Sequence, residues 1–121
     1  MRDFTKLKVW QKGHELVLLV YKITSNFPKE EKYSLVDQMR RVAVSITSNI
    51  AEGFGRRSWK DKVKFYTMAS GSLIELRNQF YIARDVGYLN SVRFDKLMSL
   101  SVVVSKLIGG LIRGAKVKGK I

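Results

Sequence analysis

The chain has 121 residues, which suits a single domain, and its 45% apolar content can bury a core and excludes an unfolded chain. It contains no cysteine, which excludes disulfides and cysteine-based zinc sites. Lys and Arg total 23 against 10 acidic residues, and this formal charge of +13 favours polyanions, chiefly nucleic acid and secondarily an anionic membrane.

Two features of the sequence predict where the protein works. No apolar run reaches the roughly 18 residues that a membrane span needs. Residues 1–15 are charged throughout, unlike the apolar core of a secretory signal peptide. We therefore expect a soluble, cytoplasmic protein without a membrane partner.

The first half of the chain predicts two helices. Apolar residues recur at alternating steps of three and four over about residues 9–26, and Pro28 stops this pattern. Ser34, with Asp37 three residues later, resembles a capping box and predicts the start of a second helix that ends near Gly53 or Gly55. The predicted buried stripes are Gly13, Leu16, Val20, Ile23 and Phe27, then Leu35, Met39, Val42, Ala43, Ile46 and Ile50.

The second half predicts two more helices. Ser58 and Asp61 repeat the capping pattern before a helix that runs to about residue 86, where Gly87 provides a stop. Asn90 or Ser91 caps the fourth helix, expected over about residues 92–113. The buried stripe of the third helix is Tyr66, Ala69, Leu73, Leu76, Phe80 and Ala83. Residues 1–115 then form one domain, followed by a basic tail over 116–121.

Four helices joined by short loops, with no alternating strand pattern, predict an all-α, antiparallel up-and-down four-helix bundle. The fourth helix is apolar almost all round, and the first carries a second stripe of Trp10, Val17 and Tyr21. Such surplus apolar faces favour burial against other subunits. The alternative is a wide core with a few exposed apolar side chains.

The residues for an enzyme are scarce. His14 is the single histidine, and the acidic residues form no i, i+3 or i+4 pair on a helix as a di-metal site requires. We expect no catalytic residue, no metal and no cofactor, and we interpret His14 as a packed or surface side chain.

The segment GFGRRS at residues 53–58 raises the possibility of a phosphate loop. It matches neither GxxxxGK[ST] nor GxGxxG, and it follows a helix instead of a strand. We interpret Gly53 and Gly55 as the cap and turn of the second helix, where glycine tolerates positive φ.

The residues after these glycines are densely basic. With Trp59 and Tyr66 interleaved, they resemble a patch that binds phosphates and offers a surface for base stacking, although a solvated charged face has the same pattern. The predicted phosphate contacts are Arg40, Arg56, Arg57, Lys60, Lys62 and Lys64, with Lys116, Lys118 and Lys120 on the tail. A polar stripe on the second helix includes Arg41, Ser45 and Glu52. It is either the solvent-exposed face of this helix or an interface between subunits, which we call a subunit seam.

The segments QMRR, NIAEGFGR and GSLIEL, with KVWQKGHELVLLVYKI before them, resemble the four-helix-bundle proteins encoded in intervening sequences of bacterial 23S ribosomal RNA genes, over about residues 4–115. The motif positions that we interpret as structural or at a subunit seam are Gln38, Arg41, Ser45, Asn49, Glu52, Gly53, Gly55, Gly71, Ser72 and Glu75. Arg40, Arg56 and Leu76 also match the motif, and the two arginines are among the predicted phosphate contacts. The chain departs from the usual pattern at Lys62-Val63 and at Gly109-Gly110.

The resemblance implies a homopentameric barrel without enzymatic activity. It also implies kinship with the accessory protein of diversity-generating retroelements, a basic pentamer that binds nucleic acid and a reverse transcriptase. Our leading hypothesis is an oligomeric protein that binds RNA or DNA backbone. The alternative is a protein-interaction scaffold for a polymerase-like enzyme such as a reverse transcriptase, in which the charge serves to steer association.

Overall fold

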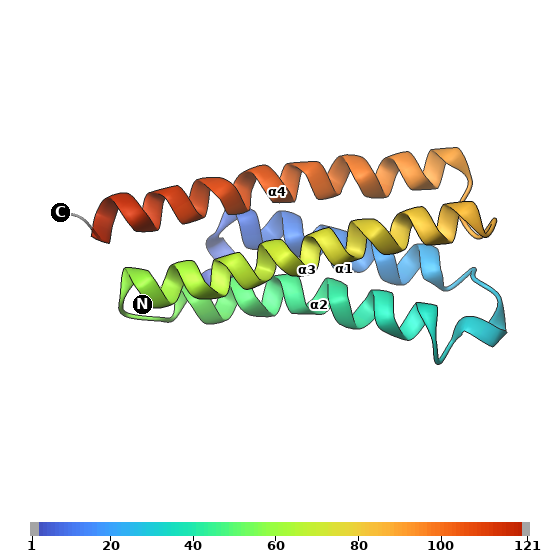
Figure 1. Cartoon of the computed structure of the whole chain (residues 1–121), viewed down its shortest axis with the longest axis horizontal. Coiled ribbons are helices and arrows are strands. Elements are labelled where there is room, and N and C mark those ends of the chain that lie inside the picture. Colours follow the sequence, from blue (N-terminus) through green and yellow to red (C-terminus); the bar gives the residue numbers. More distant parts are fainter. Residues whose placement is uncertain (1–2, 120–121) are drawn as a thin grey trace.

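The computed structural model describes residues 3–119, which form a bundle of four long helices (Figure 1). A short 3-10 turn, η1 (Phe4–Lys6), precedes α1 (Lys8–Thr24), and a second, η2 (Lys29–Glu31), lies in the loop before α2 (Leu35–Phe54). Then follow α3 (Trp59–Asp85) and α4 (Ser91–Gly119). The prediction of an all-α, up-and-down bundle is confirmed for the described chain.

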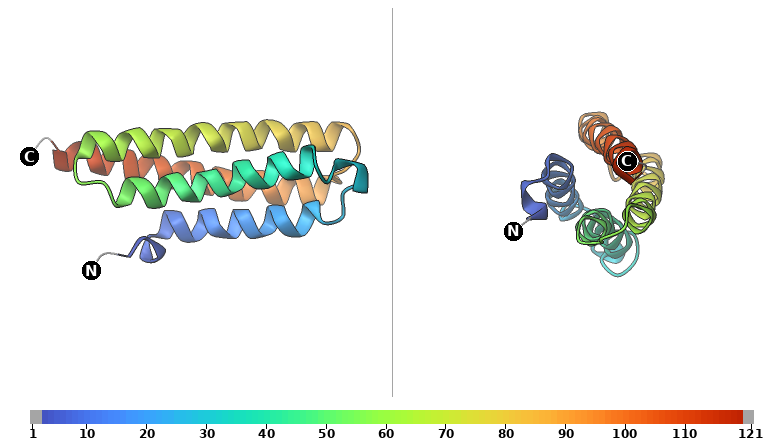
Figure 2. Two further views of the ribbon diagram at one scale, coloured as in Figure 1. Left: turned by 90° about the horizontal axis from the view of Figure 1, so that it is seen from below. Right: turned by 90° about the vertical axis from the view of Figure 1, so that its left-hand side faces the viewer.

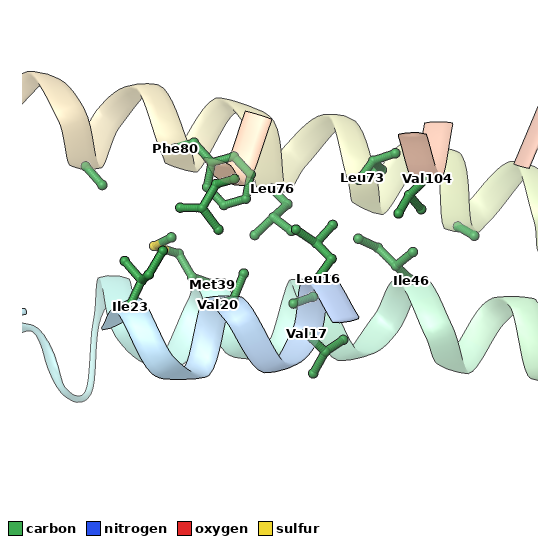
Figure 3. Close-up of a cluster of buried hydrophobic side chains, with 14 of the residues drawn as sticks. Leu16, Val17, Val20, Ile23, Met39, Ile46, Leu73, Leu76, Phe80 and Val104 are labelled. Atoms are coloured by element: carbon green, nitrogen blue, oxygen red, sulfur yellow. The ribbon is translucent and has the colours of Figure 1, made fainter. Parts of the chain in front are cut away.

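Each helix packs beside its neighbours in sequence, and α4 returns to contact α1, so the four helices surround one core (Figure 2). The predicted stripes of α1 and α3 are buried throughout. In α2 four of the six predicted residues are buried, while Leu35 and Val42 are half-buried at the edge. Figure 3 shows side chains from all four helices meeting in this core: Leu16, Val17, Val20, Ile23, Met39, Ile46, Leu73, Leu76, Phe80 and Val104.

The predicted starts of α2, α3 and α4 are all confirmed, but the capping hydrogen bond predicted for Ser34 is wrong. The Ser58 hydroxyl accepts the backbone N–H of Asp61 at 3.1 Å, and the Asn90 side chain accepts that of Arg93 at 2.8 Å. Ser34 precedes α2 but caps nothing, because its hydroxyl donates instead to the Glu31 carboxylate.

The end of α3 follows the expected pattern. Gly87 has φ +90°, and the N–H of Tyr88 bonds to the Ala83 carbonyl at 2.8 Å while that of Gly87 bonds to Arg84 at 3.0 Å. This pair of bonds is the Schellman motif, in which glycine occupies the left-handed position.

Gly53 and Gly55, at the end of α2, do not have the positive φ that was predicted, so another property explains why these positions are glycine. Gly55 caps α2 with φ −78°, and Gly53 lies inside the helix. A Cβ on Gly53 would lie 2.7 Å from the Tyr66 ring, so glycine allows α2 and α3 to approach closely.

α4 is longer than predicted. It continues through Gly109 and Gly110 and past residue 113 to Gly119, so the basic segment begins as helix and not as a tail. Of the described helices α4 alone is long and apolar enough to cross a membrane, a criterion that core helices of soluble proteins also meet. Its Val92, Val103 and Val117 remain exposed in the single chain.

Candidate nucleic-acid interface

The up-and-down topology brings three basic segments to one end of the bundle. Figure 1 shows the N-terminal segment, the α2–α3 turn and the end of α4 at the same end, although they are far apart in sequence. Residues 3–15, 46–71 and 106–119 make up this half of the molecule, which we call the basic end. Its cations are Lys6, Lys8, Lys12, Arg56, Arg57, Lys60, Lys62, Lys64, Lys106, Arg113, Lys116 and Lys118, and its acids are Asp3, Glu15, Glu52 and Asp61.

The charge is therefore polarised along the bundle. The basic end has twelve cations and four acids, an excess of eight positive charges. The other described half has nine cations and six acids, an excess of three. Gathering many cations in one region raises the positive electrostatic potential there, and this potential attracts a polyanion.

The cations of the α2–α3 turn differ in their partners. Arg56 pairs with Glu52 at 3.2 Å and lies over the Phe65 ring, with 4.5 Å between the guanidinium carbon and the ring centroid. Lys60 lies 5.9 Å from the Trp59 ring centroid. Arg57 and Lys64 are exposed and have no ion-pair partner among residues 3–119. Of these cations, Arg57 and Lys64 are therefore the most available to bind a phosphate.

Lys62 has a structural role that the sequence analysis missed. It is half-buried, and its ammonium donates to the carbonyls of Phe54 at 2.7 Å and Gly53 at 3.4 Å. These carbonyls belong to the last turn of α2, where the helix dipole favours a cation. Lys62 therefore caps α2 from the first turn of α3.

The two predicted stacking residues are not free platforms. Tyr66 is 2% exposed, so a base cannot lie on its outer surface. Trp59 packs against Gly119, where an added Cβ would overlap the indole ring. Trp59 thus holds the end of α4 against the start of α3.

The predicted tail residues are positioned by a helix. Lys116 and Lys118 are exposed in the last turns of α4, beside the start of α3, while Lys120 lies outside the described residues. The sequence analysis also missed Lys6, Lys8 and Arg113, which lie at the basic end. The predicted topology contained the signal for Lys6 and Lys8, since antiparallel helices place the start of α1 beside the α2–α3 turn.

Arg40 lies in the other half and is engaged there. Its Nε donates to the Thr24 hydroxyl at 3.0 Å and its terminal nitrogen to the Tyr21 carbonyl at 3.3 Å, while the guanidinium carbon lies 4.6 Å from the centroid of the Tyr21 ring. It therefore joins α2 to the last turn of α1, distant from the other predicted phosphate contacts.

Several motif residues find partners within the chain. Arg41 pairs with Asp37 at 3.0 Å, and the Asn49 amide donates to the Ser45 carbonyl at 2.8 Å. Gln38, Gly71 and Glu75 are exposed, and Ser72 is half-buried. Arg41 pairs within α2, and Glu52 pairs with Arg56 just after the helix, so neither side chain needs a neighbouring subunit to balance its charge.

His14 lies on the surface of α1 and stacks on Trp10, with ring centroids 4.7 Å apart. Within residues 3–119 no group of three His, Cys, Asp or Glu side chains is placed to hold a metal ion.

The fold and the basic end define a small, strongly basic four-helix-bundle protein. The sequence matches the family described as 23S rRNA-intervening sequence protein over residues 5–110, and the chain belongs to that family. This confirms the family resemblance of the quoted motifs.

A solved structure supports the fold. It is the crystal structure of a protein with unknown function from the S23 ribosomal protein family of Bacteroides thetaiotaomicron. The TM-score is 0.77 at 20% identity, over 86% of this chain and 97% of that one. At this identity the likeness concerns the fold alone. No curated protein matches this sequence.

Proposed function

We propose that this protein is a non-enzymatic, oligomeric nucleic-acid-binding protein that contacts the phosphate backbone of RNA or DNA through its basic end. The observation that carries the proposal is the meeting of three basic segments at one end of the bundle, with an excess of eight positive charges. Cations that neutralise phosphates release bound counterions, which gives sequence-tolerant binding that weakens with salt.

The contacts proposed for this site are the exposed cations that the fold leaves available. Arg57, Lys60 and Lys64 lie at the α2–α3 turn, and Lys116 and Lys118 lie on the adjacent end of α4. Lys62 and Arg40 have structural hydrogen bonds, so we assign them to the fold first.

Two triple substitutions of equal charge test the location. The first changes Arg57, Lys60 and Lys64 to Gln; the second changes Lys29, Lys32 and the exposed Arg93 to Gln in the other half, away from the α1–α4 groove. Each set includes one lysine over an aromatic ring, Lys60 over Trp59 and Lys32 over Tyr33.

Filter binding to duplex DNA and structured RNA over a range of salt provides the measurement. The first triple should lower the slope of log affinity against log salt for duplex DNA by about 2 to 3, and the second should change it little. Equal effects of both triples would show that binding is spread over the surface. Absence of binding at low salt would reject the function and favour the scaffold role.

We further propose that the protein associates with copies of itself in the cytoplasm, as the family resemblance implies for a pentamer. The support in this chain is the apolar face shared by α1 and α4. A groove of about 420 Å³ there is lined by Leu18, Leu19 and Leu100, with Leu18 56% exposed, and by the charged Glu15, Lys22 and Lys96. A second copy would cover this surface and give α4 the burial that its composition favours. Light scattering measures the mass; a mass of 13.9 kDa would reject association.

A further inference from the structure

A small cavity opens at the basic end, where the start of α1, the end of α2, the start of α3 and the end of α4 meet. Its volume is about 260 Å³. Leu7, Phe54 and Leu111 form its apolar and aromatic walls, and the buried Tyr66 closes it from below without offering a free ring face. Pockets for drug-sized ligands hold about 300–1,000 Å³, so this cavity suits one small ring system.

Glycine keeps the α4 side of this cavity open. Gly114 lines it, and a Cβ built on Gly114 would meet no other atom within 4 Å. Gly110, one turn earlier, lines it as well. Glycine inside a helix costs about 1 kcal/mol relative to alanine. Two such residues facing one cavity therefore preserve space at the expense of helix stability.

The polar groups of the cavity are cationic or neutral. Lys118 is exposed and lines the cavity from the last turn of α4, and Lys62 lines it beside the end of α2. Burial raises the pKa of the Tyr66 hydroxyl, which keeps it protonated at neutral pH. Among residues 3–119, no Asp or Glu lines the cavity, so a ligand with an anionic group is favoured.

We propose that this cavity receives one unpaired base of a nucleic-acid strand, with the adjacent phosphate on Lys118. The inference rests on the proposed function and deepens it, because it names the form of nucleic acid that the basic end recognises. A base supplies a flat aromatic ring for the apolar walls, and its phosphate supplies the charge that the lysines favour. A paired base cannot enter, so the protein prefers single strands to duplex.

Substitution of Gly114 provides a test that removes no charge. Gly114→Leu fills the cavity, and Gly114→Ala is the matched control that adds a Cβ into open space. Both changes favour the helix, so loss of folding is not expected. Circular dichroism and light scattering check that each variant keeps its helix content and mass.

The probes are an oligothymidylate of about ten nucleotides, within the span of known single-strand sites, the same backbone without bases, a duplex, and free thymidine monophosphate. Wild type should bind oligothymidylate at least about fivefold, and up to about 150-fold, more tightly than the abasic strand, since stacking of one base has this worth. Gly114→Leu should remove that difference by weakening oligothymidylate alone. Gly114→Ala should stay within about twofold of wild type on the same scale.

The other outcomes separate the two proposals. If no strand or duplex binds, the proposed function fails. If oligothymidylate and the abasic strand bind wild type equally, or Gly114→Leu weakens both alike, the base site is wrong while backbone binding stands. If thymidine monophosphate binds as tightly as the strand, the ligand is a free nucleotide and the strand assignment is wrong.

Discussion

Single residues at the α2–α3 junction show how neighbouring positions with similar chemistry have separate roles. Gly53 and Gly55 stand two residues apart, yet Gly53 makes room for Tyr66 while Gly55 ends the helix. Lys62 and Lys64 stand equally close, yet Lys62 caps α2 while Lys64 is exposed. Helical geometry points such residues in different directions.

Gly53→Ala tests the close approach of α2 and α3. The new Cβ would overlap the buried Tyr66 ring, and overpacking of a core costs about 1–3 kcal/mol. This exceeds the gain in helix propensity, so we expect a lower free energy of unfolding in urea. Gly71→Ala is the control: its Cβ meets nothing within 4 Å, and it should stabilise by about 0.5–1 kcal/mol. Equal effects of the two changes would contradict a packing role for Gly53.

Lys62→Met and Lys64→Met separate capping from phosphate binding. Loss of the Lys62 ammonium leaves the Phe54 carbonyl without its 2.7 Å bond, which should cost about 1–2 kcal/mol of stability. Lys64→Met should leave stability nearly unchanged and reduce the salt dependence of nucleic-acid binding. Urea denaturation and filter binding measure the two properties. A loss of stability confined to Lys64→Met would reverse the assignment.

At the scale of elements, a hydrogen-bonded link joins the two loops at the far end of the bundle. Tyr88, just after α3, donates its hydroxyl to the Glu31 carboxylate at 2.7 Å, and the Ser34 hydroxyl donates to the same carboxylate. The Tyr88 ring also packs on Phe27, with centroids 5.3 Å apart. The α1–α2 loop is thereby held to the α3–α4 turn.

This link predicts a dependence of stability on pH. The hydrogen bonds from Ser34 and Tyr88 lower the pKa of Glu31 in the folded protein. Its contribution is therefore complete above the ordinary glutamate pKa and is lost as pH falls through the lowered value. The melting temperature of wild type should fall toward acid pH. This fall should be smaller in Glu31→Gln, whereas Glu30→Gln, an equal change of charge, should show the same fall as wild type. Identical pH profiles for wild type and Glu31→Gln would contradict the link.

At the scale of the whole molecule, two surfaces are proposed to bind partners: the basic end and the apolar face of α1 and α4. They lie on different parts of the bundle, so binding of nucleic acid and self-association can be altered separately. The charges should govern the first and Leu18 with its neighbours the second.

Leu18→Lys tests this separation. It places a charge at the 56% exposed apolar position of the α1–α4 groove, and we expect the mass in solution to fall toward that of the single chain because a buried unpaired charge is unfavourable. Tyr33→Lys, at an 85% exposed loop position, is the control and should leave the mass unchanged. An unchanged mass for Leu18→Lys would place the interface elsewhere.

Much of this architecture is determined by the sequence alone. The spacing of apolar residues predicted the buried stripes, and Ser58, Asn90 and Gly87 marked helix ends through local hydrogen bonds. Such signals depend on residues close in sequence, where helical geometry leaves few alternatives. The motifs identified the family, and the net charge is the basis on which nucleic acid is proposed as the partner.

Only the tertiary structure decided which residues share a surface. It extended α4 so that Lys116 and Lys118 lie on a helix beside the α2–α3 turn, placed Arg40 in the other half, and turned Lys62 and Tyr66 inward. It also revealed the cavity at Gly114, whose walls come from four separate segments. Such proximities arise from the packing of distant segments, which the local periodicity of a sequence does not encode.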